Sequence, residues 1–226
     1  MAYAFIVAFY APLAEHLLAL VHVEHLFGSV YPAASHTKRM GGVHEVAHHK
    51  RTVIHIRRAL SVGMPYPTLT SNLHHEIELV VAIGKGGKNI AAAQAMEHIW
   101  GYAVGLDMTR RDLQNDMKKQ GRPWCIGKAF EHSAPISAIT PAAQAGDVEQ
   151  AEIWLQVNGK DRQRSHVNQL IWNIAETIEV LSQAWELQPG DLIMTGTPEG
   201  VGAVQAGDVL EGGITGLGTL RVAITA

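Results

Sequence analysis

The sequence is poor in cysteine and in long unbroken apolar runs, and each shortage excludes a class of protein. A single cysteine, Cys125, cannot form an internal disulfide, which favours a reducing compartment over a disulfide-stapled secreted domain. The apolar stretch over residues 1–27 is interrupted by Pro12, Glu15 and His16, and no Lys or Arg precedes it. We therefore expect neither a signal peptide nor a membrane span, and we expect a cytoplasmic protein.

A basic stripe of the kind that binds phosphate backbones is also lacking. The 18 Lys and Arg residues are scattered, and the formal net charge is −3, so we do not expect a nucleic-acid partner. The 226 residues, 47% of them hydrophobic, suffice for one large domain with a full core. Composition changes near residue 62, because eight of the thirteen histidines precede it. We divide the chain into a divergent N-terminal segment, residues 1–61, and a patterned domain, residues 62–226.

The hydrophobic pattern of the second part predicts strands with a few helices. Leu73–Gly84 ends in a β-branched apolar run and predicts a strand, Ile90–Trp100 is Ala-rich and predicts a helix, and Gly101–Met108 predicts a returning strand. The other predicted elements are a short helix over Arg110–Lys119, a hairpin turning at Asn158-Gly159, an amphipathic helix over Asn168–Trp185 and short strands from Pro189 onward. The expected fold class is α+β, mainly β.

Two carboxylates that lie two positions apart on a predicted strand, Glu76 and Glu78, form the first candidate site. Side chains at this spacing share one face of a strand, and buried carboxylates need a partner such as a metal ion. Asp107, at the end of the next predicted strand, could supply a third oxygen ligand for a hard cation such as Mg²⁺ or Mn²⁺. Alternatively, both glutamates lie on a solvated strand face while Ile77 and Leu79 face the core.

Six segments between about Val62 and the C-terminus occur in an order that a known family shares. They are SNLHHEIELVVAIGKGG, GYAVGLDMTRRDLQ, KKQGRPWCIGKAFEHSAPI, VNGKDRQ, LQPGDLIMTGTPEGVG and GDVLE. Together they resemble the fumarylacetoacetate hydrolase family, and within it they are most similar to the bacterial fumarylpyruvate hydrolases and acylpyruvases. The resemblance implies the mixed β-roll of the family's C-terminal domain, with flanking helices, and a homodimer.

The resemblance also implies an activity and a cofactor. The implied reaction is the hydrolysis of a carbon–carbon bond in a small keto acid, an acylpyruvate such as fumarylpyruvate, which yields pyruvate and a carboxylic acid in aromatic catabolism. Glu76, Glu78 and Asp107 match the family's ligands for Mg²⁺ or Mn²⁺. A 1,3-dicarbonyl acid can chelate such an ion, which then stabilises the enolate that leaves when the bond breaks.

Four further residues match substrate-binding and catalytic positions of the family. Arg111 and Gln114 of TRRDLQ match residues that hold the substrate's carboxylate and keto oxygens. Lys128 of GKAF matches the active-site lysine, and Thr197 of TGTP matches a threonine near the substrate. Taken without their motifs, Arg111 and Lys128 would be read as surface charges, and Thr197 as part of a tight turn.

The N-terminal segment departs from the family pattern. The family's hydrolases take their water-activating base from a pattern close to G-R-N-Y-x-x-H-x-x-E, which this sequence lacks. By its distance from Glu76, His36 is the candidate catalytic base, but Arg39 stands where its glutamate partner is expected. We hypothesise that residues 1–61 are divergent or derive from a displaced reading frame. Resequencing the coding DNA tests this, and a clean in-frame read would contradict the frame shift.

Three other functions stay open at this point. His44, Glu45 and His48 match H-E-x-x-H, which on a helix would bind Zn²⁺ and make a metalloprotease. A second is a decarboxylase or isomerase of keto acids such as oxaloacetate on the same metal site, because decarboxylation needs no attacking water. The third is a catalytically impaired homologue that binds metal and keto acids without turnover.

Overall fold

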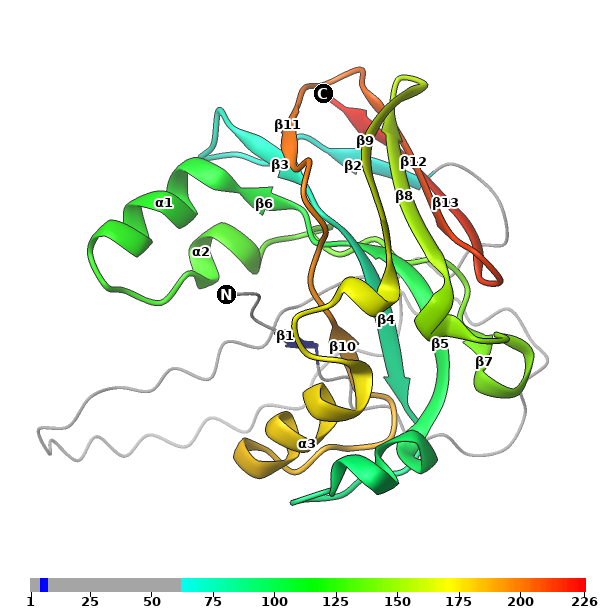
Figure 1. Ribbon diagram of the computed structural model, residues 1–226. Helices are drawn as coiled ribbons and strands as arrows, with labels where there is room; N and C mark the ends of the chain where they lie inside the picture. Colours follow the sequence, from blue (N-terminus) through cyan, green and yellow to red (C-terminus); the bar gives the residue numbers. More distant parts are fainter. Residues whose placement is uncertain (1–4, 8–61) are drawn as a thin grey trace, which may run out of the picture. The chain divides into compact units, whose positions relative to one another are not determined.

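The computed structural model describes residues 5–7 and 62–226, and strands dominate these ranges (Figure 1). The candidate base His36 and the H-E-x-x-H residues His44, Glu45 and His48 lie outside the described residues. In the part that is described, no helix has the length and apolar character that crossing a membrane requires.

The strands form three sheets. The first has the order β1 (Phe5–Val7), β10 (Leu192–Met194), β4 (Ile77–Ile83), β5 (Ile99–Leu106) and β7 (Thr140–Pro141). The second has the order β11 (Gly202–Val204), β3 (Leu73–His75) and β6 (Thr109–Arg110). The third has the order β2 (Val62–Pro65), β13 (Gly218–Thr225), β12 (Val209–Ile214), β8 (Glu152–Val157) and β9 (Lys160–His166). Because β2 and β13 are parallel while their neighbours are antiparallel, the third sheet is mixed, as predicted.

The helices are few and short. The α-helices are α1 (Arg111–Lys119), α2 (Cys125–Lys128) and α3 (Ile174–Ala184), and the 3-10 helices are η2 (Ala92–His98), η3 (Ala142–Gln144), η4 (Val148–Gln150) and η5 (Val167–Gln169). The α1 prediction is confirmed. The α3 helix is shorter than the predicted Asn168–Trp185, because Asn173 caps it and forms a reciprocal capping box with Glu176, with both bonds at 2.9 Å.

Two predicted elements differ from the structure. The segment Leu73–Gly84 is not one strand, because the chain leaves the second sheet after β3 and enters the first sheet at β4. The helix predicted over Ile90–Trp100 is the 3-10 helix η2, whose N-cap residue Ala91 makes no side-chain hydrogen bond. Pairing with β4 then draws the chain into β5 from Ile99, which ends the helical stretch earlier than the Ala-rich composition suggests.

The hairpin between β8 and β9 is confirmed. Asn158 and Gly159 both have positive φ values, 51° and 74°, which is the conformation that a two-residue turn between twisted strands requires. The β8 strand alternates buried and half-buried residues, so one face packs on the core and the other faces outward. This hairpin brings β9 against the segment that follows β10, close to the candidate site.

The main core lies between the first and third sheets. Ile77 and Leu79 of β4 pack in the same cluster as Ile153 and Leu155 of β8. Val80 of β4 belongs to a second apolar cluster on the opposite face of the strand. Because β4 is buried along its whole length on both faces, a carboxylate within it must find its partners inside the protein.

Three chain segments cross side by side between the first and second sheets (Figure 1). Strands β10, β4 and β5 are neighbours in the first sheet, and their continuations β11, β3 and β6 are neighbours in the same order in the second. The crossing points are residues 195–201, Glu76 and residues 107–108. A backbone hydrogen bond from Asp107 N to Glu76 O, 2.8 Å long, joins two of the crossings. Polar groups from three distant parts of the chain therefore lie close together where these segments cross.

Candidate metal centre

Three carboxylates meet where the segments cross. Glu76 stands between β3 and β4, Glu78 lies in β4, and Asp107 follows β5. One oxygen from each lies within 4.8 Å of the other two, and the residues are only 7%, 3% and 0% exposed. The alternative of a solvated strand face is wrong, because these glutamates are as deeply buried as the apolar residues beside them.

Two cationic side chains are paired with these carboxylates. The Lys128 ammonium, whose side chain is 6% exposed, donates to Glu76 Oε2 at 2.6 Å and to Asp107 Oδ2 at 2.7 Å. The Arg111 guanidinium donates to the other oxygen of Glu76 and, at 2.6 Å, to Gln114 Oε1. The structure thus brings together all three carboxylates and three of the four further residues that the family motifs indicated.

The two short helices bring these partners to the carboxylates. The α1 helix begins directly after β6 and carries Arg111 and Gln114, while α2 carries Lys128 at its end. The helices pack closely, because a Cβ atom at Gly127 would lie 2.9 Å from both the Cβ and the backbone N of Gln114. A larger residue at position 127 would push α2, and with it the Lys128 ammonium, away from the carboxylates.

Within the cluster, the ionised form of Glu78 is destabilised. Burial and then the Asp107 carboxylate raise the pKa of Glu78 well above its ordinary value, although Lys128 and the backbone N–H of Gly196, 2.8 Å from Glu78 Oε2, act in the opposite direction. Burial by itself would lower the pKa of Lys128, but Asp107 and Glu76 outweigh it, and the pKa is raised. Lys128 is therefore charged at neutral pH.

The residues fit a hard divalent cation. The site contains three acidic side chains (Glu76, Glu78 and Asp107) and two basic ones (Lys128 and Arg111). The acidic groups therefore exceed the basic groups by one. The ligand atoms are all carboxylate oxygens, the type that Mg²⁺ and Mn²⁺ prefer. Among the described residues, the buried Nε of Arg111 has no hydrogen-bond partner.

A carboxylate outside the cluster holds the helix that carries Arg111. Asp112 accepts hydrogen bonds from the Thr70 hydroxyl at 2.6 Å and from the backbone N of Ser71 and Leu113 at 3.0 and 2.9 Å. Burial by itself raises the pKa of Asp112, but these hydrogen bonds outweigh it, and the pKa lies below its ordinary value. Asp112 therefore ties the start of α1 to the chain that enters β3.

This anchor predicts a pH-dependent effect of Asp112→Asn. Because the folded-state pKa is lowered, the stabilisation is complete above the unfolded pKa and is lost as the pH falls through the folded one. We expect the variant to lose about 1 kcal/mol of unfolding free energy at pH 7 and progressively less at an acidic pH that approaches the folded-state pKa. Urea denaturation at both pH values measures this, and equal losses at both would contradict it.

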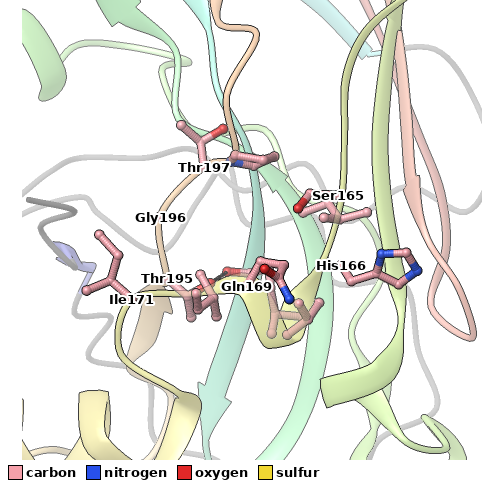
Figure 2. Close-up of a pocket in the computed structure, with 12 residues that line it drawn as sticks. Ser165, His166, Gln169, Ile171, Thr195, Gly196 and Thr197 are labelled. Atoms are coloured by element: carbon pink, nitrogen blue, oxygen red, sulfur yellow. Dashed lines mark hydrogen bonds between the residues drawn. The ribbon is translucent and has the colours of Figure 1, made fainter.

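Thr197 lies in the crossing segment between β10 and β11, beside the carboxylate cluster. It follows Gly196, whose N–H is bonded to Glu78, and it lines a pocket of about 100 Å³. Figure 2 shows Thr195–Thr197 along one wall of this pocket and Ser165 and His166 of β9 along another. The segment is more than a plain turn, because it contacts a carboxylate of the cluster and borders an open cavity.

Two buried polar residues beside the site were not among the candidate site residues predicted from the sequence. His75 and Gln163 are each 1% exposed, and His75 Nδ1 lies 2.9 Å from Gln163 Oε1. Burial lowers the pKa of His75, although its hydrogen bond with Gln163 acts the other way. Gln163 ends the VNGKDRQ segment, so membership of a shared motif was the one signal in the sequence that pointed to it.

The chain was compared with known families and proteins. The model of the fumarylacetoacetate hydrolase C-terminal family matches residues 26–225. A fumarylpyruvate hydrolase of Ralstonia sp is 53% identical over 159 residues, which cover 70% of this chain and 82% of that protein. The mitochondrial oxaloacetate tautomerase FAHD1 of Homo sapiens is 44% identical over 151 residues, which cover 67% of this chain and 68% of that protein.

A solved structure agrees with the sequence comparisons. The crystal structure of fumarylpyruvate hydrolase from Pseudomonas aeruginosa, in complex with Mn²⁺ and pyruvate, superposes with a TM-score of 0.76 at 56% sequence identity. The match covers 78% of this chain and 76% of that one. The predicted fold, α+β and mainly β with mixed sheets, is thereby confirmed together with the resemblance. The chain belongs to the fumarylacetoacetate hydrolase family.

Proposed function

We propose that this chain is a metal-dependent hydrolase that cleaves the carbon–carbon bond of acylpyruvates, with fumarylpyruvate as substrate and pyruvate and fumarate as products. The observation that carries the proposal is the buried trio Glu76, Glu78 and Asp107 with Lys128 and Arg111 against it. It is supported by 53% and 56% identity to two fumarylpyruvate hydrolases, one of them solved with Mn²⁺ and pyruvate.

Under this proposal Glu76, Glu78 and Asp107 hold Mn²⁺ or Mg²⁺. When bound, the ion supplies a Lewis acid for the carboxylate and keto oxygens of the substrate. The Gly196 N–H keeps Glu78 oriented through its 2.8 Å bond. The positive charges of Lys128 and Arg111 then help to offset the negative charges of the three carboxylates and of the incoming keto acid.

The chain's own cations also fit the bond cleavage. Water oxygen adds to the acyl carbonyl carbon, the carbon–carbon bond breaks, and its electron pair passes to the pyruvate fragment as an enolate, which takes up a proton. Lys128 and Arg111 place positive charge where that negative charge develops, and burial strengthens their effect. Gln114 holds the Arg111 guanidinium at 2.6 Å. We propose His36, in the N-terminal segment, as the base that activates the water.

The test is turnover of fumarylpyruvate, followed as loss of its ultraviolet absorbance, with Mn²⁺, with Mg²⁺ and after removal of metal by EDTA. We expect one pyruvate and one fumarate per substrate, loss of activity in EDTA, and recovery when Mn²⁺ is added in excess. The recovery controls for irreversible damage by the chelator. Absence of turnover in a preparation that binds Mn²⁺ would contradict the proposal.

A second candidate is tautomerisation or decarboxylation of oxaloacetate on the same site. The observation that favours it is the 44% identity to a mitochondrial oxaloacetate tautomerase, together with 41% identity to an oxaloacetate decarboxylase of Dictyostelium discoideum. Neither reaction requires an attacking water. The same preparation assayed on oxaloacetate separates the two candidates, because turnover of oxaloacetate without turnover of acylpyruvates would favour this one.

We further propose a cytoplasmic homodimer that acts in the breakdown of aromatic compounds. The dimer is supported by three large apolar side chains at the two ends of the α3 region, Ile171, Trp172 and Trp185, which are 71%, 50% and 58% exposed. Large apolar side chains that are this exposed are enriched at protein interfaces. Size-exclusion chromatography with light scattering should give a mass of twice 24.5 kDa, and a monomer mass would contradict the dimer.

A further inference from the structure

Gln163 is a buried amide that connects β9 to the metal centre. Its Oε1 accepts hydrogen bonds from the backbone N of Ile77, at 3.2 Å, and from His75 Nδ1, at 2.9 Å. Its Nε2 donates to Thr197 Oγ1, at 2.7 Å, and to Pro198 O, at 2.9 Å. Each polar atom of the amide therefore has two partners, and one of them, Ile77, stands between the carboxylate residues 76 and 78.

The orientation of this amide follows from two partners whose roles cannot change. The Ile77 backbone N–H can only donate, so the Gln163 atom facing it is the oxygen. The Pro198 backbone oxygen can only accept, so the Gln163 atom facing it is the nitrogen. Turning the amide over would set donor against donor and acceptor against acceptor, at a buried site where unmade hydrogen bonds are costly.

The fixed amide determines the roles of its two other partners. His75 must carry a proton on Nδ1, because that atom faces the Gln163 oxygen. The Thr197 hydroxyl must accept from Gln163 Nε2, so its own hydrogen points elsewhere. Within residues 62–226 no acceptor for that hydrogen is found, and Thr197 directly follows Gly196, whose N–H bonds Glu78. The Thr197 hydroxyl is thus a hydrogen-bond donor beside the metal centre.

The backbone holds Thr197 in this position. Gly200 has a φ of +97°, and a Cβ atom there would lie 2.0 Å from the carbonyl oxygen of Arg162, the residue before Gln163. The crossing segment is therefore in direct backbone contact with β9 at one end and bonded to Glu78 at the other. Thr197 lies between these two attachments, so its hydroxyl has little freedom to leave Gln163.

We propose that Gln163 is a positioning residue, which makes the Thr197 hydroxyl an obligate donor to the anionic oxygen of a keto acid at the metal centre. The proposal rests on the proposed function for the identity of the ligand. In Gln163→Glu the carboxylate can still accept from Ile77 N and His75, but when ionised it cannot donate to Thr197 or to Pro198 O. The Thr197 hydrogen would then turn toward the introduced carboxylate and away from the ligand, with the hydroxyl itself unchanged.

The experiment is a double-mutant cycle on the full chain loaded with Mn²⁺, with pyruvate affinity measured by calorimetry. We expect Gln163→Glu and Thr197→Val each to weaken pyruvate binding about tenfold, the effect of losing one hydrogen bond to a charged group. In the Thr197→Val background Gln163→Glu should weaken binding less than about twofold, because the hydroxyl it acts through is gone. In a Thr197→Ser background, which keeps the hydroxyl, the loss should again be about tenfold.

Several outcomes would overturn the proposal. An equal loss from Gln163→Glu with and without the hydroxyl would mean a merely structural role, as would no loss in any background. Mn²⁺ affinity without pyruvate serves as a control, and we expect it within about twofold of the wild type, since Gln163 touches no carboxylate of the cluster. If the buried charge prevents folding, Gln163→Met carries the same cycle, with the same expected dependence on the hydroxyl.

The cycle also separates this proposal from the proposed function. Suppose that the wild-type protein binds pyruvate with Mn²⁺ but does not hydrolyse fumarylpyruvate. The hydrolase proposal would then be refuted, and the double-mutant cycle could still test the role of Gln163. Wild-type protein that binds Mn²⁺ but no pyruvate would overturn the role of Gln163. If Gln163→Glu hydrolyses fumarylpyruvate and binds pyruvate with normal affinity, the hydrolase proposal stands and the positioning role of Gln163 is refuted.

Discussion

Replacing Glu78 by Gln is expected to abolish metal-dependent turnover while leaving the metal-free protein at least as stable as the wild type. Activity should fall by roughly 10³-fold or more, because a divalent ion contributes several kcal/mol to charge stabilisation and loses one of its three charged ligands. Stability should not fall, because glutamine keeps an acceptor for the Gly196 N–H and removes a buried charge that stands against Asp107.

The sign of the stability change depends on pH. Since the folded-state pKa of Glu78 is raised, ionisation of this group opposes folding as the pH rises above the unfolded value. The gain in folding stability from Glu78→Gln should therefore appear at neutral pH and vanish in acid. Thermal denaturation without metal at both pH values measures it, and calorimetric titration with Mn²⁺ measures the lost affinity.

Glu211→Gln is the matched control, because Glu211 is an exposed glutamate on β12 outside the carboxylate cluster. It should leave turnover, Mn²⁺ affinity and stability within error of the wild type. Full activity in both Glu78→Gln and Asp107→Asn would refute the metal centre. Loss of stability in metal-free Glu78→Gln would refute the account of Glu78 as a destabilised carboxylate.

Replacing Lys128 by Met is expected to destabilise the metal-free protein strongly and to make it more dependent on metal. The ammonium is shared by Glu76 and Asp107 at 2.6 and 2.7 Å, in a site where neither carboxylate can be hydrated well. Removing one partner of a buried ion pair costs about 3–5 kcal/mol. For a chain of this length we expect a fall in the melting temperature of about 6–20 °C.

Mn²⁺ should reverse much of this loss. A bound divalent ion supplies positive charge to the same carboxylates, so the increase in melting temperature on adding Mn²⁺ should be larger in Lys128→Met than in the wild type. Under the proposed function turnover should still fall, because the positive charge that we assign to the reacting bond is missing. Lys119→Met, at a lysine whose side chain is 78% exposed, is the control and should change neither quantity. An equal response to Mn²⁺ in both proteins would contradict the shared-charge account.

Local chemistry in the sequence determined several elements without help from distant residues. Asn158 and Gly159 predict their hairpin because these two residue types tolerate the positive φ values that the turn requires. The nine residues of α1 have a helical pattern of their own. The carboxylates Glu76, Glu78 and Asp107 stood out because charged residues in apolar strands are rare, and shared motifs then identified Arg111, Gln114 and Lys128 as their companions.

Other features depend on contacts between residues far apart in the chain. The break at Glu76 occurs because β3 and β4 pair with different sheets, and no residue in LHHEIELVVAIG marks that change. The α-helix expected over Ile90–Trp100 is a 3-10 helix that ends at His98, because pairing with β4 takes up the chain from Ile99. In both places the local propensity is weak, so the sheet partner decides the backbone conformation.

The sequence by itself thus determined the family, the class of fold and which side chains have the chemistry for a metal centre. Only the tertiary structure decided how the donors and acceptors around that centre are directed. The direction of the Thr197 hydroxyl is set by Gln163, 34 positions away, and Gln163 is itself fixed by Ile77, 86 positions away. A hydrogen bond depends on which atoms meet and at what angle, and that geometry arises only when β9 and the three crossing segments pack together.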